Sequence, residues 1–244
     1  MLTKGSLPTT PVKDFRFMSH HRSITIRPAA TLIMLRNSPT LGIPEVFVQQ
    51  RQATMSYAAN MVVFPGGGVE TNERLDPTMA YCPTTMTAAE LTEPQLLTAA
   101  AAAIREVAEE TQLQLPRHQP IHLVDRWITP NIPVFRRRYD VVTFATILAD
   151  DQEPVHDTTE ATASYWACPE ELLQRWQWGQ ISLLPPTWFH LTQLAQRQAD
   201  DALSSLRSVT DADTPKMFPS WAMDGQYAQE FYRLADVAGQ HHST

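Results

Sequence analysis

Three glutamates share one side of a predicted helix. Glu106, Glu109 and Glu110 are spaced i, i+3 and i+4, and in an α-helix this spacing brings their side chains to one face. Two unit charges about 4 Å apart repel by on the order of 4 kcal/mol at an effective dielectric of 20. Oxygen ligands in this number suit Mg²⁺ or Mn²⁺, which bridge to phosphate oxygens and lower the pKa of an attacking water. The pattern therefore indicates a divalent-metal site for hydrolysis of a phosphoanhydride.

The same helix also fits a simpler interpretation, an ordinary solvated face. Arg105 and Glu109 have the spacing of a surface i,i+4 ion pair, and the three glutamates alone favour that interpretation. The glycine turn Gly66–Gly68 reverses the balance. Glycine has no Cβ and tolerates positive φ, so such a turn lets the backbone approach a ligand closely. A triple glycine alone is more often just a turn, but the two features together favour a site.

Apolar periodicity predicts the elements that must position this turn and this helix. A long strand over Ile24–Leu35, bent or interrupted at Pro28, is followed by a hairpin partner over Glu45–Arg51. The short strand Met61–Phe64 leads directly into the glycine turn. The capping-box pattern at Thr92 and the alanine run after it predict a helix to about Gln112. Its predicted buried face consists of Leu96, Ala100, Ala103, Ile104 and Val107.

Further elements follow the helix. The pattern predicts strands over 121–128, 139–148 and 163–167, and helices over 169–176, 186–198 and 226–237. A basic run, Arg136–Arg138, lies in the loop between the first two of these strands.

Length and composition bound the class of protein. A chain of 244 residues with 43% hydrophobic content can bury one substantial core. The net charge of −7 argues against broad binding to nucleic acid or to an anionic membrane. The two cysteines, Cys82 and Cys168, are too few for a disulfide framework and are not spaced as a zinc site. With no apparent secretion signal or membrane-spanning stretch, we expect a cytoplasmic protein.

The turn and the helix together resemble the Nudix box, G-x5-E-x7-R-E-U-x-E-E-x-G-U, in which U is aliphatic. Eight positions match in type and order: Gly67, Glu73, Arg105, Glu106, Val107, Glu109, Glu110 and Leu113. Two features depart from the pattern. Gln112 replaces the last glycine, and 31 residues, 74–104, stand where the pattern has seven. Such an insertion in a connecting loop is tolerable, because loop closure costs only roughly 0.6 kcal/mol per doubling of length.

The inserted box resembles in particular the coenzyme A diphosphatase-like Nudix proteins of the peroxisomal type and their bacterial relatives. The resemblance covers roughly residues 24–195. It implies an α/β/α sandwich with a mixed β-sheet between helices, an insertion at about 74–97, and C-terminal helices. We expect a flexible arm over 1–22, a Nudix hydrolase domain over 23–204, and a linker and helix over 205–244.

The resemblance also implies roles for individual residues. The metal ligands would be Glu106, Glu109 and Glu110, with the carbonyl of Gly66 as an additional ligand. Arg105 would orient the glutamates, and Glu73 would stabilise the turn. The general base stays open among Glu109, Glu110 and a carboxylate from a distant loop, for which Glu160 is the first choice and Asp157 the second. A surface acid at a strand edge explains Glu160 equally well.

Substrate contacts are expected from Arg51, Arg138, Gly67 and Gly68. Arginine suits bidentate binding of phosphate, although an exposed basic turn accounts for Arg138 as well. Trp127, Trp166, Trp188 and Phe189 fit the core better than a base-stacking site.

The function implied is Mg²⁺- or Mn²⁺-dependent hydrolysis of the diphosphate in a nucleoside diphosphate linked to another group. Coenzyme A or an acyl-CoA is the leading substrate; ADP-ribose, a dinucleotide or a nucleotide sugar is an alternative. A non-catalytic module that binds a nucleotide and regulates a partner is the rival interpretation. We expect a small-molecule partner, no nucleic acid and no membrane, and leave a homodimer open. The insertion is either a substrate-selecting lid over the acidic helix or, if it packs on the opposite face, a structural element or part of a dimer contact.

Overall fold

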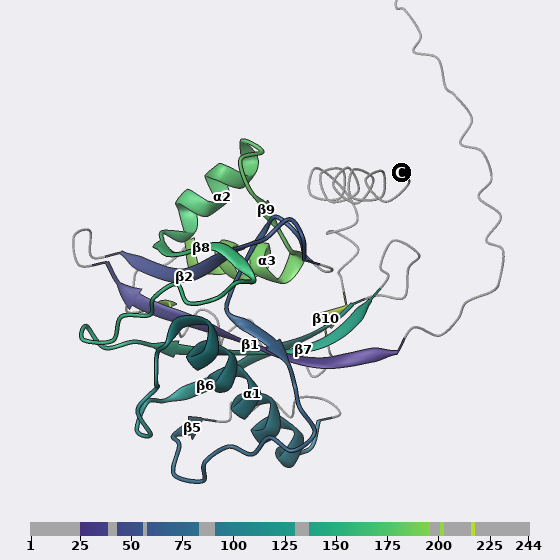
Figure 1. Ribbon diagram of the computed structural model, residues 1–244. Coiled ribbons are helices and arrows are strands. Elements are labelled where there is room, and N and C mark those ends of the chain that lie inside the picture. The colour runs from purple at the N-terminus through teal and green to yellow at the C-terminus, as the bar shows by residue number, and fades with distance from the viewer. Residues whose placement is uncertain are drawn as a thin grey trace, which may run out of the picture.

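The described chain forms one curled, mixed β-sheet with helices on both faces (Figure 1). The computed structural model describes residues 25–38, 43–55, 58–82, 91–129, 137–195, 201–202 and 216–217. The predicted arm over 1–22 and the last predicted helix, 226–237, lie outside these residues. The strands are β1 Ile26–Asn37, β2 Pro44–Arg51, β3 Met61–Val63, β4 Gly66–Gly68, β5 Tyr81–Cys82, β6 Ile121–Ile128, β7 Arg138–Ile147, β8 Ala161–Ala167, β9 Ser182–Leu183 and β10 Lys216–Met217. The helices are α1 Glu93–Thr111, α2 Pro169–Gln177 and α3 Pro185–Ala195.

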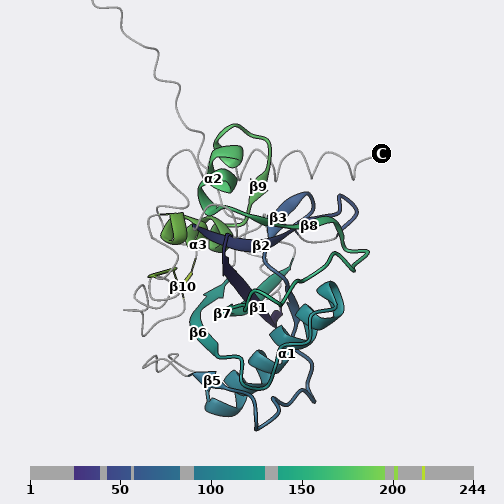
Figure 2. The same cartoon turned by 90° about the vertical axis from the view of Figure 1, so that its left-hand side faces the viewer.

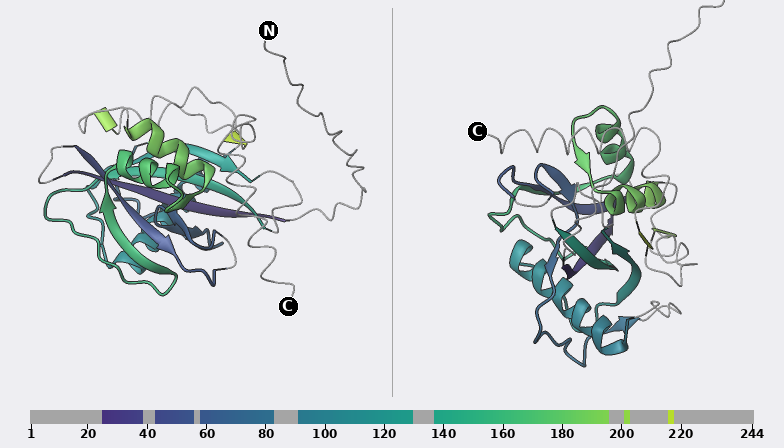
Figure 3. Two further views of the ribbon diagram at one scale, coloured as in Figure 1. Left: turned by 90° about the horizontal axis from the view of Figure 1, so that it is seen from above. Right: turned by 90° about the vertical axis from the view of Figure 1, so that its right-hand side faces the viewer.

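Strand β1 is the centre of the sheet, whose order is β10-β6-β7-β1-β2-β3-β9. It pairs in parallel with β7 over its first ten residues, and in antiparallel fashion with β2 at its far end. Midway along β1, the three glycines of β4 pair with residues 29–31. In the view from above, β1 runs along the sheet with α2 and α3 over it (Figure 3). This pairing holds the glycine turn against the middle of the sheet.

Side chains alternate along β1 between two apolar cores. Leu32 and Met34 pack with α1, whereas Ile33 and Leu35 pack with residues of α2 and α3. Both cores are needed because a central strand is covered on each face. Figure 2 shows α1 on one side of the sheet and α2 with α3 on the other. The predicted α/β/α sandwich is therefore confirmed.

Helix α1 begins and ends close to its predicted limits. The amide of Thr92 donates to Oε1 of Gln95 at 2.7 Å, so the predicted capping box is present. The helix ends at Thr111, and Gln112 follows in the left-handed conformation with φ 56° and ψ 5°. The predicted buried face is correct except at Ile104, which is only partly buried.

The residues inserted before Arg105 contribute to the core on the α1 side. Leu75, Met79, Tyr81 and Leu91 pack against that core, and β5 pairs with the edge of β6. Residues 83–90 lie outside the described chain. The described parts of the insertion therefore pack on the α1 side of the sheet, and the role expected for the insertion stays a prediction.

The predicted interruption at Pro28 is wrong. Pro28 stays paired with Asp140 of β7, and its carbonyl accepts the amide of Val69 at 3.1 Å. Proline lacks only the donor, so a strand continues through it where the partner needs no amide from that residue. No helix among the described residues is long and apolar enough to cross a membrane.

Candidate active site

Close packing explains two glycines of the turn. The carbonyl of Pro65 accepts the amide of Leu32 at 3.0 Å and the hydroxyl of Thr31 at 2.7 Å. A Cβ on Gly66 would collide with backbone atoms of β1, and a Cβ on Gly67 would collide with the carboxylate of Glu106. Nothing lies within 4 Å of a Cβ built on Gly68. The turn is therefore pressed between the sheet and an acidic side chain.

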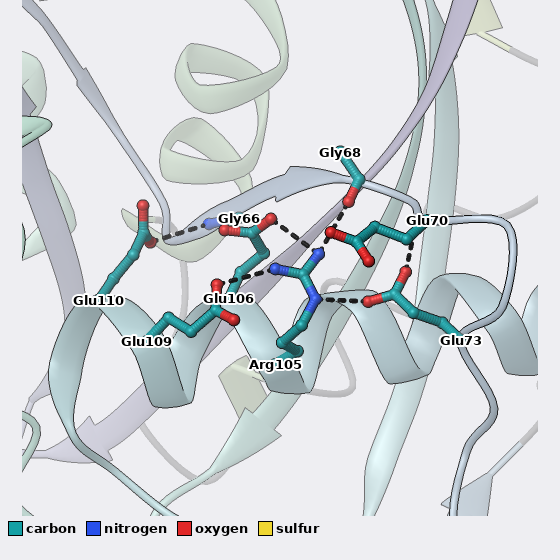
Figure 4. A network of polar contacts seen from close by, with 8 residues as sticks. All are labelled: Gly66, Gly68, Glu70, Glu73, Arg105, Glu106, Glu109 and Glu110. Atoms are coloured by element: carbon teal, nitrogen blue, oxygen red, sulfur yellow. Dashed lines mark hydrogen bonds and ion pairs between the residues drawn. The ribbon is translucent and has the colours of Figure 1, made fainter.

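Arg105 connects the acidic helix to the turn (Figure 4). Its guanidinium pairs with Glu73 at 2.5 Å, with Glu109 at 2.8 Å and with Glu106 at 3.0 Å. Nη2 also donates to the carbonyl of Gly68 at 2.9 Å. Partial burial alone would lower the pKa of Arg105, but the bonds to Glu73 and Glu106 outweigh it and raise the pKa. The arginine is therefore charged and fixed from both sides.

Glu110 is the buried member of the acidic cluster. Glu110 is 6% exposed, and its Oε2 accepts a hydrogen bond from the amide of Gly66 at 3.2 Å. Burial raises its pKa to about 8, and the charges of Glu106 and Glu160 add to this effect. The bond to Gly66 and the charge of Arg51 act in the opposite direction without cancelling it. The groups around Glu110 therefore do not fully stabilise a negative charge on its carboxylate.

Glu106 experiences the same imbalance. Burial raises the pKa of its carboxyl, and the neighbouring charges of Glu109 and Glu160 add to that rise. Arg105 lowers the pKa but does not restore the ordinary value.

Arg51 and Glu160 reach the cluster from the sheet. The two side chains meet at the end of β2, where Nη2 of Arg51 lies 3.3 Å from Oε2 of Glu160. The side chain of Arg51 is 15% exposed and that of Glu160 is 56% exposed. The backbone carbonyl of Glu160 accepts the amide of Gln52 at 2.9 Å. Two residues 109 positions apart are thus brought beside Glu110.

Comparisons with known proteins concern the fold that surrounds this site. The sequence model of the NUDIX domain family matches residues 83–186, a range that includes α1 and the strands β6 to β8. This part of the chain is therefore similar to the NUDIX domain family. A NUDIX hydrolase from Alicyclobacillus acidocaldarius is 23% identical, with a TM-score of 0.61, over 75% of this chain and 97% of its own. This likeness shows that the two share the Nudix fold.

Other similar structures align less well. The MutT protein from Methanosarcina mazei is 12% identical, with a TM-score of 0.45, over 72% of this chain and 99% of its own. The NUDIX domain of Shewanella oneidensis NrtR, solved with ADP ribose, is 14% identical, with a TM-score of 0.43, over 70% and 85%. No curated protein matches the sequence significantly.

The Nudix metal ligands predicted from the box are close together but not arranged around a common point. Among the described residues, no three acidic, histidine or cysteine side chains are grouped as a metal centre. The carboxylates of Glu106 and Glu109 are instead paired with Arg105. The donors still fit Mg²⁺ or Mn²⁺, because they are carboxylate oxygens and the raised pKa values of Glu106 and Glu110 show that their charged forms lack a compensating positive charge.

The remaining residues predicted for the site make other contacts. Arg138 is half-buried at the start of β7, where its Nε donates to the carbonyl of Thr129 at 2.9 Å. The contact made by Gly66 is through its amide, so the predicted role of its carbonyl stays a prediction. Glu73 accepts the amide of Glu70 at 2.6 Å, which fits the turn-stabilising role. The four aromatic residues pack in or against the core, as expected: Trp127, Trp166, Trp188 and Phe189.

Gln112, which stands within the Nudix box, has a partner that the sequence analysis did not predict. Gln112 donates through Nε2 to Oδ2 of Asp157 at 2.8 Å. The signal was present in the sequence, since a residue that stands where the box has glycine is expected to adopt positive φ. The partner of Gln112, Asp157, lies 45 positions away in sequence and could not be predicted from the sequence.

Proposed function

We propose that the protein is a divalent-metal-dependent hydrolase. It cleaves the diphosphate of a nucleoside diphosphate linked to another group, by attack of water on one phosphorus. The observation that carries the proposal is the buried Glu110, tied to the glycine turn and placed beside Glu106. An ordinary solvated helix face has no reason to bury a carboxylate next to another one.

In this proposal the glutamates hold Mg²⁺ or Mn²⁺. Glu106 and Glu110 supply carboxylate oxygens, and the exposed Glu109 adds a third when it leaves Arg105. A divalent ion bound there lowers the pKa of water and offsets charge on the phosphoryl oxygens. Arg105 keeps the acidic helix and the turn in register through Glu73 and the carbonyl of Gly68.

Arg51 and Glu160 complete the proposed reaction site. Nε of Arg51 is buried and has no hydrogen-bond partner within the part of the chain that the structure describes, so a donor is left for a phosphate oxygen. Glu160 is exposed beside it and is our first choice for the base that takes the proton from water. Glu109 and Glu110 are the alternatives for this role.

Coenzyme A or an acyl-CoA is the proposed substrate. The support for it is the resemblance of the inserted box to the coenzyme A diphosphatase-like subgroup. ADP-ribose, a dinucleotide such as NADH, and a nucleotide sugar contain the same diphosphate and are the competing substrates.

A hydrolysis screen tests the proposal. The purified protein is incubated with each of these compounds and either Mg²⁺ or Mn²⁺, and products are followed by ³¹P NMR. We expect one compound to yield two phosphate-containing products, and no reaction in the presence of a chelator. Binding of a compound without product with either ion would instead identify a nucleotide-binding module that does not catalyse hydrolysis.

A further inference from the structure

Residues 153–160, the segment between β7 and β8, contact the C-terminal end of α1. The amide of Val155 donates to the carbonyl of Thr111 at 3.0 Å, and the amide of Asp157 donates to the carbonyl of Glu110 at 3.0 Å. The last carbonyls of a helix have no partner within the helix, so these bonds satisfy two of them. The segment thereby rests directly on the backbone of the buried glutamate.

Gln112 adds a side-chain bond to this contact. It occupies the left-handed conformation, with its amide bonded to the carbonyl of Ala108 at 3.1 Å. A residue with a Cβ pays roughly 1–2 kcal/mol in this conformation, whereas glycine does not. Glycine, however, could not form the 2.8 Å bond from Nε2 of Gln112 to Asp157. The strained position is occupied by a residue whose side chain reaches the segment.

Three residues beyond Asp157, the same segment presents Glu160. Gln52 holds that end through its amide, which donates to the carbonyl of Glu160, and through its side chain, which donates to the carbonyl of Thr159. The carboxylate of Glu160 then meets Arg51. The segment is therefore held at Asp157 by the helix and at Glu160 by β2.

The other end of the segment is also fixed. Glu153 accepts Nη1 of Arg36 at 2.8 Å and Nε1 of Trp166 at 2.8 Å. The guanidinium of Arg36 lies 4.2 Å from the centre of the Trp166 ring. Between these fixed ends, the side-chain bond from Gln112 adds to the two backbone bonds that hold the middle of the segment on the end of α1.

We propose that Gln112 is a positioning residue, whose bond to Asp157 holds residues 155–160 on the end of α1 and thereby fixes the carboxylate of Glu160. The inference rests on the proposed function, since it assigns Glu160 a part in the hydrolysis. It does not depend on which diphosphate is the substrate.

The test compares Gln112→Gly with Asp157→Ala and Asp157→Asn. Gln112→Gly removes the bond and relieves the backbone, so we expect kcat to fall about 10- to 100-fold with an unchanged or higher melting temperature and little change in KM. Asp157→Ala has the same kinetic effect. Asp157→Asn keeps an acceptor for Gln112 and is the matched control for the position of the segment, which hydrogen exchange follows. A merely structural residue would lower activity and stability together.

A double mutant shows whether the effect passes through Glu160. In a Glu160→Gln background, which is itself slower than wild type, Gln112→Gly is expected to change kcat by less than about twofold, because coupled residues are not additive. An unchanged kcat in Gln112→Gly, an equal loss in both backgrounds, or a fully active Glu160→Gln variant would overturn the inference.

Hydrogen exchange separates this inference from the proposed function. The amides of Val155 and Asp157 should exchange faster in Gln112→Gly and Asp157→Ala than in wild type and Asp157→Asn. If wild-type protein hydrolyses no diphosphate, the proposed function fails, and with it the role in hydrolysis. Exchange then still decides whether Gln112 holds the segment, and unchanged exchange would refute that part as well.

Discussion

Helices α1 and α2 carry the same surface pattern with different consequences. Each has an arginine and a glutamate four residues apart: Arg105 with Glu109 at 2.8 Å, and Arg175 with Glu171 at 4.0 Å. The side chains of Glu109 and Glu171 are both 59% exposed. From spacing alone the two pairs are indistinguishable, and each would contribute only a few tenths of a kcal/mol.

The difference lies in what packs against each arginine. Arg175 has the ring of Tyr165 beside it, 5.8 Å from its guanidinium to the ring centre. Arg105 instead meets Glu73 and the carbonyl of Gly68. These two residues precede Arg105 by 32 and 37 positions in sequence but are adjacent to it in space. A common local pattern becomes a candidate site only when the tertiary fold presses a glycine turn onto it.

The largest difference between the helices is expected in turnover. Glu109→Gln and Glu110→Gln should each reduce kcat at least about a thousandfold, because a bound metal contributes several kcal/mol to the transition state. Glu171→Gln is the matched control, with equal exposure and an equivalent arginine, and should retain wild-type kcat. Steady-state kinetics with the substrate from the screen, together with circular dichroism, measures both. Wild-type turnover in Glu110→Gln would mean that the metal site is misplaced.

The second effect concerns the turn. Gly67→Ala forces the carboxylate of Glu106 to move, and a displacement of this kind should lower kcat about 100-fold. Gly68→Ala has open space around its new methyl group and should stay within a fewfold of wild type. The two variants are compared by steady-state kinetics. Equal activity would contradict the claim that only Gly67 must be a glycine to make room for Glu106.

The third effect is on stability. Arg105→Lys loses the planar fork that contacts Glu73, Glu106 and Glu109, so the free energy of unfolding should fall by about 1–3 kcal/mol. Arg175→Lys on α2 should change it by less than about 0.5 kcal/mol. Urea denaturation of both variants provides the comparison, and equal losses would show that the two pairs are alike after all.

The smallest effect is a pH dependence of the metal-free protein. Glu110 has a pKa of about 8 when folded, against 4.5 as the ordinary value, so between these values the folded protein holds a proton that the unfolded chain releases. Its contribution to stability is complete below the lower value and is lost as pH rises through the upper one. Unfolding of wild type and Glu110→Gln in chelator, across this range, should show a steeper loss for wild type. Parallel curves of stability against pH for the two proteins would show that burial does not raise the pKa of Glu110.

Much of the fold was predictable because apolar periodicity and caps are local signals. The limits of α1, the hairpin of β1 and β2, and strands β6 and β7 followed from them within one or two residues. The short strands β4, β5 and β9 were missed, since two or three residues held by a partner strand leave no periodicity. Continuity through Pro28 was missed because it depends on β7.

The candidate site was predictable as a set of residues but not as an arrangement. The spacing of the glutamates placed them on one face, yet it did not distinguish the buried Glu110 from the exposed Glu109. The amide of Gly66 donates to the side chain of Glu110, and this contact depends on the fold. Likewise, Gln112 was recognised as a departure, while its partner Asp157 required the fold.

Direct measurement of metal binding tests the central claim, that the turn and the acidic helix form a divalent-metal site. Mn²⁺ is titrated into wild type, Glu110→Gln and Glu171→Gln, and free Mn²⁺ is followed by electron paramagnetic resonance. We predict saturable binding to wild type and Glu171→Gln, and affinity weakened at least about tenfold in Glu110→Gln. Equal binding by all three proteins, or none by wild type, would contradict the account.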